Sequence, residues 1–424
     1  MSLRRRSSFI RPLTDFLSAE ASGGIVVVVA AIAALVWANS PWRGSYESLW
    51  STDFGATFGR FHFSMDLRKW VNDGLMTIFF FVVGLEIKRE LVEGELRDRR
   101  KAITPVVAAI GGMVVPALIF LAWTIGTPQA KGWGIPMATD IALAVGLLTL
   151  AGPRIPSGVK LFLLALAIVD DIGAIVVIAL FYGHGGRTAL LGVAAGALVA
   201  ALVLRRVGVT SFAAYVLLGV VMWWALHEAG VHATLAGVAM GLLAPSKPFV
   251  QSELIDVGEL LDVSTVEHAM ASAHIARSSV SVVEWLEHRL HGWTSFVVVP
   301  LFAIANAGIP VSVSALREAS GARVAWGVAT GLFVGKPLGI LFATWLVVRM
   351  GAGSLPEGAS WRTLVPAAIV AGVGFTVSLF VTELAFSGVV ADQAKVGVLG
   401  ASIVAGVVGL GVASLLPARK RPAD

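Results

Sequence analysis

Residues 157–182, SGVKLFLLALAIVDDIGAIVVIALFY, decide the fold, because they place two adjacent aspartates near the centre of a largely apolar run. A helix needs about 20 predominantly apolar residues to cross the hydrocarbon core of a bilayer, so this run predicts a transmembrane helix. A charge at the centre of a bilayer costs at least about 2.5 to 3.5 kcal/mol, and a carboxylate at that depth faces a cavity or a partner. Asp170 and Asp171 therefore mark a candidate functional site inside a membrane protein.

The composition of the whole chain agrees with a lipid bilayer as its solvent. Of its 424 residues, 57% are hydrophobic and 14% are charged, whereas soluble domains average about 25% charged residues. The net charge of +5 is spread over short loops between apolar runs, which favours the bilayer as partner over nucleic acid. The chain has no cysteine, which excludes disulfides, thiol catalysis and cysteine metal sites.

Apolar runs of similar length recur along the chain and predict an all-α membrane protein with twelve transmembrane helices. The eighth run is short. Basic residues concentrate on the segments that a cytoplasmic N-terminus would place inside, so both termini are predicted to be cytoplasmic. The predicted helices span residues 22–39, 70–91, 102–124, 132–150, 157–182, 188–206, 211–227, 231–245, 293–314, 322–349, 361–386 and 393–417.

Two connections between these helices are unusually long. In residues 40–69, loosely alternating apolar residues bounded by glycines begin at Phe54 and predict a small β-hairpin. Residues 246–291 are predicted to form a long cytoplasmic loop, in which ELIDVGELLDV is typical of an amphipathic surface helix.

Four ionisable residues fall near the centres of predicted spans: Asp140, Asp170, Asp171 and Lys336. One Asp–Lys pair would merely hold two helices together, but three carboxylates against one lysine leave an acidic excess. Protons or a bound cation must neutralise this excess, and we expect the carboxylates to titrate as a coupled set near physiological pH. Na⁺ prefers oxygen ligands and would compete with the protons. The set therefore predicts exchange of a cation for protons at a site that alternates between the two membrane faces.

Adjacent residues on a helix point about 100° apart. Asp170 and Asp171 therefore cannot share one direction. We expect one of them to face the cation cavity and the other to reach Lys336 or a neighbouring helix.

Two of the predicted spans contain helix-breaking residues. WGIPMATDIA carries Pro136 just before Thr139 and Asp140, and VAGVGFTVS carries Gly372 and Gly374. Such interruptions let the backbone unwind and present carbonyls and helix ends to an ion. Each interrupted helix is the middle member of a three-helix group, helices 3 to 5 and helices 10 to 12, as expected for two inverted repeats.

A second group of ionisable residues lies at the predicted cytoplasmic ends of helices 2 and 9. Histidine titrates near neutrality and shifts with neighbouring carboxylates, so this group is a candidate pH-responsive element. Ordinary interfacial charges are the alternative, and a packing role is at least as good an explanation for the histidine that begins helix 8. The group comprises Glu86, Glu90, Glu287, His288 and His291, and His232 at the start of helix 8 is a weaker candidate for the same role.

Other classes of function find less support. The chain contains no Walker A loop, no GxSxG elbow and no HExxH motif, so we predict that it is not an enzyme and needs no cofactor. A cation channel remains an alternative, because channels also use acidic rings. A proton-coupled carrier of organic solutes is another, but it would predict an aromatic or Arg-lined pocket.

From about Asp15 to Leu416 the sequence resembles the NhaA-type sodium/proton antiporters, a family of inverted-repeat transporters. The ATD, VDDIGA and GKPLG segments are together highly specific. The motifs that carry the resemblance are DFLSAEASGGI, FFVVGLEIKREL, AAIGGMVVPAL, IPMATDIALAVG, LALAIVDDIGAI, GVHATLAGV, PLFAIANAGI, GKPLGI and GFTVSLF.

The resemblance implies roles for the residues inside the spans. Asp171 would be the principal carrier of cation and proton, and Asp170 beside it would pair with Lys336. Thr139 and Asp140 would line the break in helix 4, where Asp140 offsets helix-end charge. Na⁺ would bind at Asp171, Asp170 and Thr139.

The resemblance also implies that Glu86, Glu90, Glu287, His288 and His291 take part in the pH response. The segment 54–65 would support a homodimer. Residues 251–281 match the family poorly.

The expected protein is thus a single polytopic transporter domain, residues 1–424, of the bacterial inner membrane. Core helices at about 102–182 and 322–417 would move against interface helices at about 22–91 and 188–314. We expect exchange of Na⁺ or Li⁺ for H⁺ by alternating access, electrogenic with more than one proton per sodium, regulated by pH, and serving sodium extrusion and pH homeostasis.

Overall fold

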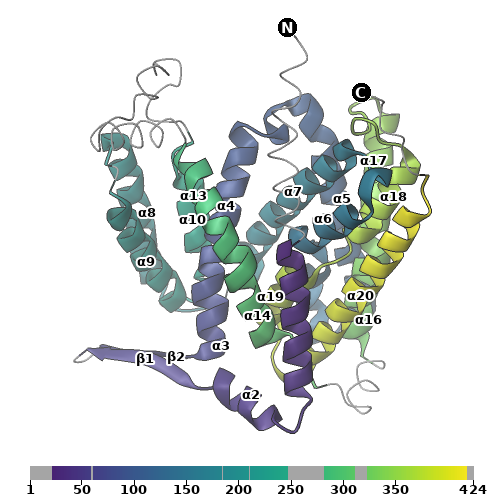
Figure 1. The fold of residues 1–424 in the computed structure, drawn as a ribbon. Helices are drawn as coiled ribbons and strands as arrows, with labels where there is room; N and C mark the ends of the chain where they lie inside the picture. Colours follow the sequence, from purple (N-terminus) through teal and green to yellow (C-terminus); the bar gives the residue numbers. More distant parts are fainter. Residues whose placement is uncertain are drawn as a thin grey trace, which may run out of the picture. The chain divides into compact units, whose positions relative to one another are not determined.

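A computed structural model describes residues 22–58, 61–183, 185–209, 211–246, 281–310 and 322–417, most of which are helical (Figure 1). Within these ranges five helices are long and apolar enough to cross a membrane, and three bent helix pairs meet the same test as pairs. The chain is therefore a multi-pass α-helical membrane protein.

The chain forms two compact units. The first comprises the described residues up to Met76, those from Asp98 to 183, and those from Ser295 onward. The second comprises Thr77–Arg97 and the described residues between Gly185 and Thr294.

In the first unit the long helices pack closely because glycines line their contacts. Gly111 of α5 lies against Gly339 of α17, and a Cβ on Gly111 would come within 2.4 Å of the Gly339 carbonyl oxygen. Leu148, Leu166 and Leu364 belong to the buried apolar core. The helices of this unit, besides the N-terminal ones, are α5 (Arg99–Thr124), η3 (Pro128–Met137), α6 (Ile141–Leu150), η4 (Gly152–Arg154), α7 (Ser157–Phe181), α14 (Val299–Asn306), α16 (Arg323–Thr330), η7 (Gly331–Gly335), α17 (Lys336–Arg349), α18 (Trp361–Val370), α19 (Phe375–Ala385) and α20 (Gly388–Ser414).

Two spans of this unit are broken where the sequence predicts an interruption. The chain leaves helical geometry at residues 138–140, between η3 and α6, and again at 371–374, between α18 and α19. Each pair of half-helices bends by 43° at its break. The two breaks contact each other, because the Asp140 backbone N–H donates to the Val373 carbonyl oxygen at 2.7 Å.

The N-terminal part of the first unit contains the predicted β-hairpin. Strand β1 (Asp53–Phe58) pairs antiparallel with β2 (Phe61–Asp66), between α2 and α3 along the chain (Figure 1). The helix Ser22–Ala38 precedes α2 (Arg43–Trp50) at a bend of 114°. Helix α2 was not predicted, since it is short and partly polar. The hairpin leads into α3 (Leu67–Lys69) and the π-helix η1 (Trp70–Leu75).

The second unit is built from α4 (Met76–Val92), η2 (Glu95–Arg97), α8 (Ala189–Val207), α9 (Phe212–Glu228), α10 (Thr234–Leu243) and α13 (Val282–Trp293). Helix α9 packs between α8 and α10. Gly237 lets α10 approach α4 closely, because a Cβ at this position would lie 2.1 Å from the Thr77 carbonyl oxygen.

Two helices begin earlier in the chain than the sequence predicts. The predicted loop 246–291 ends earlier, since α13 begins at Val282, where the Ser281 hydroxyl caps it by accepting from the Glu284 N–H. Helix α20 likewise begins at Gly388 and not at residue 393. Helix α13 carries Glu284, Glu287 and His288 in its first two turns, and α20 carries Asp392 and Lys395 in its second turn. These ionisable residues lower the hydropathy on which the predicted boundaries rest.

Helix α13 continues through a π-helical turn, η6 (Thr294–Val298), into α14. The segment ELIDVGELLDV and the basic residues near both termini lie outside the described residues.

Candidate functional site

Asp140 ties the two broken helices of the first unit together. As N-cap of α6 it accepts from the Leu143 N–H through Oδ1 at 3.0 Å. Its Oδ2 accepts from the Thr376 backbone N–H at 3.1 Å and from the Thr376 hydroxyl. Thr376 lies in the first turn of α19, so one buried carboxylate sits at the N-terminal ends of two half-helices, where the helix dipoles favour negative charge.

Asp170 forms a buried ion pair with Lys336. Lys336 Nζ lies 2.8 Å from Asp170 Oδ2, and neither side chain is exposed. Thr139 donates its hydroxyl to the same oxygen at 2.8 Å and also lies 3.0 Å from the Ala371 carbonyl oxygen. Lys336 additionally donates to the Met137 carbonyl. The pair is thus held by both breaks and by α7 and α17.

A π-helical turn lies directly before Lys336. Residues Gly331–Gly335 form this turn. The glycine at 335 packs against a proline of α5, with a built Cβ only 2.9 Å from Pro116 Cα. π-Helical turns are rare and occur frequently at functional sites. Here the turn precedes the one lysine of α17 and ends in close contact with α5.

Asp171, the next residue of α7, is also buried. Asp170, Lys336 and Asp140 are the charged groups close enough to act on it. Among the described residues, no hydrogen-bond donor reaches Asp171 Oδ1 or Asp170 Oδ1. Asp170 is thus the aspartate that reaches Lys336, whereas Asp171 forms no ion pair within the described residues; that Asp171 faces a cation cavity stays a prediction.

The site offers oxygen ligands of three kinds. Carboxylates come from α7, a hydroxyl comes from Thr139, and the non-helical segments 138–140 and 371–374 contribute backbone carbonyls, of which those of Ala371 and Val373 accept hydrogen bonds from Thr139 and Asp140. Within the described ranges no three His, Asp or Glu side chains gather as a transition-metal site would require. The donor set suits a hard monovalent cation, which takes carboxylate, hydroxyl and carbonyl oxygens.

In the second unit, Glu287 and Arg89 form an ion pair between α13 and α4. Burial raises the pKa of Glu287 to about 7, and Arg89 opposes this shift. His291 Nδ1 lies 3.9 Å from Glu86 Oε1. Burial, then the charges of Arg89 and His288, lower the pKa of His291 below its usual value.

The structure thus gathers most of the predicted pH-responsive group at one place. Glu90 is buried on α4, and its charge acts on Glu287. His288 is exposed on α13. His232 lies in the turn before α10, on a different segment of the same unit.

Sequence reasoning missed several of these partners. Thr376 directly follows the glycine break, yet its hydroxyl was not assigned a role. Arg89 lies one helical turn after Glu86, a spacing that places both near one helix face. A further ion pair joins α20 to α19, with Lys395 Nζ 2.5 Å from Glu383 Oε1. The sequence shows only two opposite charges in apolar runs and does not indicate that they pair.

The chain is similar to known antiporters along nearly its whole length. A family model described as Na⁺/H⁺ antiporter 1 matches residues 14–413. The Na⁺/H⁺ antiporter NhaA of Anaeromyxobacter sp. (strain Fw109-5) is 46% identical over 426 residues, covering 97% of this chain and 93% of that protein. The Na⁺/H⁺ antiporter NhaA of Rhodopirellula baltica is 44% identical over 418 residues, covering 95% and 94%.

A solved structure shares the fold. The sodium proton antiporter MjNhaP1 from Methanocaldococcus jannaschii, at pH 8, aligns with a TM-score of 0.53 over 96% of this chain and 98% of that chain. Its sequence identity is 13%, so this likeness bears on the fold alone.

Proposed function

The chain belongs to the Na⁺/H⁺ antiporter 1 family, and we propose on that premise that it exchanges Na⁺ or Li⁺ for H⁺ across a bacterial inner membrane. The observation that carries this proposal is the contrast between two adjacent buried aspartates. Asp170 is neutralised by Lys336 at 2.8 Å, whereas Asp171 forms no ion pair with a cation of the described residues, and its Oδ1 meets no donor there. A buried carboxylate oxygen in this position needs either a proton or a cation.

Competition at Asp171 is the proposed basis of exchange. A cation binds the carboxylate only after its proton has left, so the site holds one or the other. Thr139 and the carbonyls of the unwound segments are suited to complete the oxygen shell around the ion. If only the loaded forms of the site change their exposure from one membrane face to the other, the flux of protons drives the flux of Na⁺.

Asp170 and Lys336 are proposed as the second titrating element. When Na⁺ approaches Asp171, its positive charge disfavours a protonated Lys336 nearby, so a second proton can leave with the first. Release of more than one proton per Na⁺ makes the exchange electrogenic, and the membrane potential then contributes to sodium extrusion and pH homeostasis.

The proposal also covers the helix arrangement, the oligomeric state and the orientation of the whole molecule. We place core helices at about 102–182 and 322–417, related as two inverted repeats in a twelve-helix transporter, and interface helices at about 22–91 and 188–314. Alternating access would move the core relative to the interface helices. The hairpin within 54–65 is proposed to support a homodimer, and both termini are proposed to be cytoplasmic.

The proposal is tested in everted membrane vesicles that carry a preformed pH gradient reported by a quenched dye. Adding Na⁺ should collapse the gradient and restore fluorescence. Asp171→Asn should abolish this response at normal protein levels. The matched control is Asp392→Asn, which removes a partly buried carboxylate of α20 outside the two breaks and should retain exchange.

Other outcomes distinguish the alternatives. A Na⁺ current that is linear in membrane potential and independent of the pH gradient would indicate a cation channel. Undiminished exchange in Asp171→Asn vesicles would contradict the proposed role of Asp171.

A further inference from the structure

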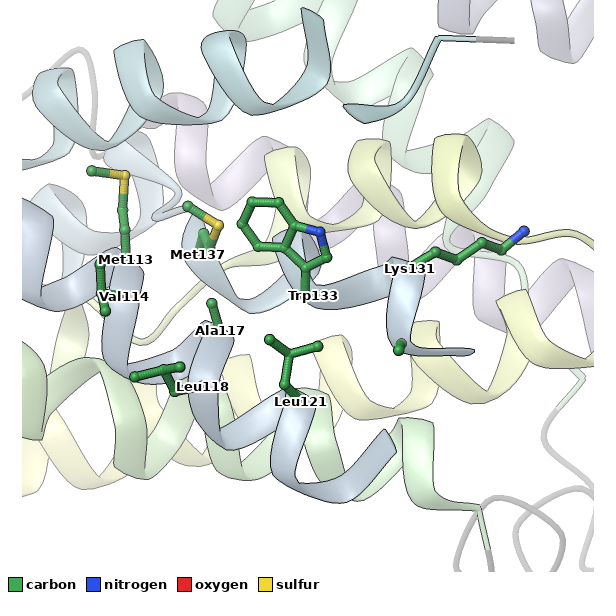
Figure 2. Close-up of a pocket in the computed structure, with 9 residues that line it drawn as sticks. Met113, Val114, Ala117, Leu118, Leu121, Lys131, Trp133 and Met137 are labelled. Atoms are coloured by element: carbon green, nitrogen blue, oxygen red, sulfur yellow. The ribbon is translucent and has the colours of Figure 1, made fainter. Parts of the chain in front are cut away.

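An apolar groove of about 610 Å³ lies in the first unit between α5 and η3. Figure 2 shows its lining, with Met113, Ala117 and Leu121 on α5 and with Trp133 and Met137 on η3. The α5 side is open to the surroundings, because Val114 and Leu118 are 47% and 59% exposed. Since α5 is long and apolar enough to span the membrane, the natural surroundings of this opening are lipid chains.

One end of the groove carries a positive charge. Lys131 lines the groove, and its side chain extends away from Met113 and Met137 at the opposite end (Figure 2). The ammonium lies 5.6 Å from the centre of the Phe386 ring, and no carboxylate of the described ranges forms an ion pair with it. An anion from outside the chain would therefore compete there with no carboxylate of the described ranges.

The length of the groove matches one leaflet of a bilayer. Met113 and Leu121 are eight residues apart on α5, which corresponds to about 12 Å along the helix axis. Half of a hydrocarbon core is about 15 Å thick. Lys131 follows the turn at the end of α5, where the apolar helix stops and a headgroup would lie.

We propose that this groove binds an anionic phospholipid, with an acyl chain along Met113, Ala117 and Met137 and the headgroup phosphate at Lys131. The apolar lining accounts for the chain, and the ammonium, which has no carboxylate partner among the described residues, accounts for the choice of an anionic headgroup. Lysine binds phosphate as a point charge.

The inner end of the groove adjoins the residues of the candidate site. Met137 lines the groove, and its carbonyl accepts from Lys336. Met113 packs on Gly173, two residues after Asp171, so closely that a Cβ there would lie 2.2 Å from the methionine sulfur. A bound chain would support both methionines. Its influence on transport rests on the proposed function, whereas the binding itself does not.

The test uses purified protein reconstituted into phosphatidylcholine vesicles that contain a small fraction of phosphatidylglycerol with a photoreactive group in mid-chain. After illumination and proteolysis, labelling should concentrate on residues 113–121 and 133–137. Photoreactive phosphatidylcholine in the same vesicles should label these peptides several-fold less. Because labelling requires no transport, its failure is distinguishable from failure of the proposed exchange.

Four variants complete the experiment. Val114→Trp fills the groove and should remove its labelling, while Val407→Trp, on an α20 position that is 68% exposed, should not. Lys131→Gln should lower phosphatidylglycerol labelling to the phosphatidylcholine level, whereas Arg349→Gln, at the end of α17, should not. Uniform labelling of all exposed helix faces, or equal labelling by both lipids in the unmodified protein, would overturn the proposal.

Discussion

Lys336 Nζ lies 2.8 Å from Asp170 Oδ2 with both side chains fully buried, so each charge depends on the other. Removing one partner of a buried pair leaves an uncompensated charge and costs about 3 to 5 kcal/mol. We therefore expect Lys336→Ala to lower the thermal stability of the detergent-solubilised protein strongly. It should also shift the pH dependence of exchange in vesicles, because Asp170 then lacks its cation.

The double variant Asp170→Asn with Lys336→Ala separates loss of charge balance from loss of packing. Removing both charges should restore part of the stability that Lys336→Ala loses, since no unpaired charge remains. If the double variant loses as much stability as the two single variants lose together, the ion pair between Asp170 and Lys336 does not stabilise the protein.

The long apolar helices of the described residues and the two breaks were predictable from sequence because their signals are local. A long apolar run indicates a membrane helix, and a proline such as Pro136 or a glycine such as Gly374 weakens a helix at its own position. The pairing of Asp170 with Lys336 followed from the resemblance. The donors to Asp140 did not follow, because Thr376 is 236 residues away and reaches it only through the crossing of two breaks. The π-helix before Lys336 also has no sequence signal, and the ion-carrying roles of the aspartates stay predictions.

The hydroxyl of Thr376 supplies Asp140 with a donor that no apolar side chain can replace. A hydrogen bond to a charged group contributes about 1.5 to 3 kcal/mol. Thr376→Val should therefore destabilise the protein by about this amount and lower Na⁺-driven exchange several-fold. The control is Thr382→Val on the same helix, where the hydroxyl donates to the Ser378 carbonyl and its loss costs about 0.5 to 1.5 kcal/mol. Equal effects of the two variants would argue against a special role for Thr376.

Tyr182 fixes the half-helix η3 through one buried hydroxyl. Its oxygen accepts from the Gly134 N–H at 3.1 Å, and its O–H donates to the Lys131 carbonyl at 2.9 Å. Tyr182→Phe leaves both backbone groups unpaired at a cost of about 1 to 3 kcal/mol for a buried group. We expect lower thermal stability and slower exchange. Tyr215→Phe, which removes a hydroxyl bonded to the Val209 carbonyl near the protein surface, should change neither measurably.

The pKa of Glu287 sets the direction of a pH effect on stability. Its pKa is about 7 in the folded protein against 4.5 ordinarily, so folding takes up a proton between these values. Stability due to this group is therefore greatest below about pH 4.5 and falls as pH rises to about 7. Because a tenfold change in proton affinity is worth about 1.4 kcal/mol, the fall amounts to a few kcal/mol at most.

His291 acts in the opposite direction, since its lowered pKa makes stability rise with pH up to its ordinary value of 6.5. Arg89, Glu90, Glu284, Glu86 and His288 also act within this cluster. The effect of Glu287 is therefore read as a difference between thermal unfolding profiles of the unmodified protein and of Glu287→Gln, measured from pH 4.5 to 8. The variant should lack the fall towards pH 7, because it carries no proton to lose. Glu284→Gln, an exposed neighbour on α13, should keep it. Parallel profiles for the unmodified protein and Glu287→Gln would mean that Glu287 titrates at its ordinary pKa despite its burial against Arg89.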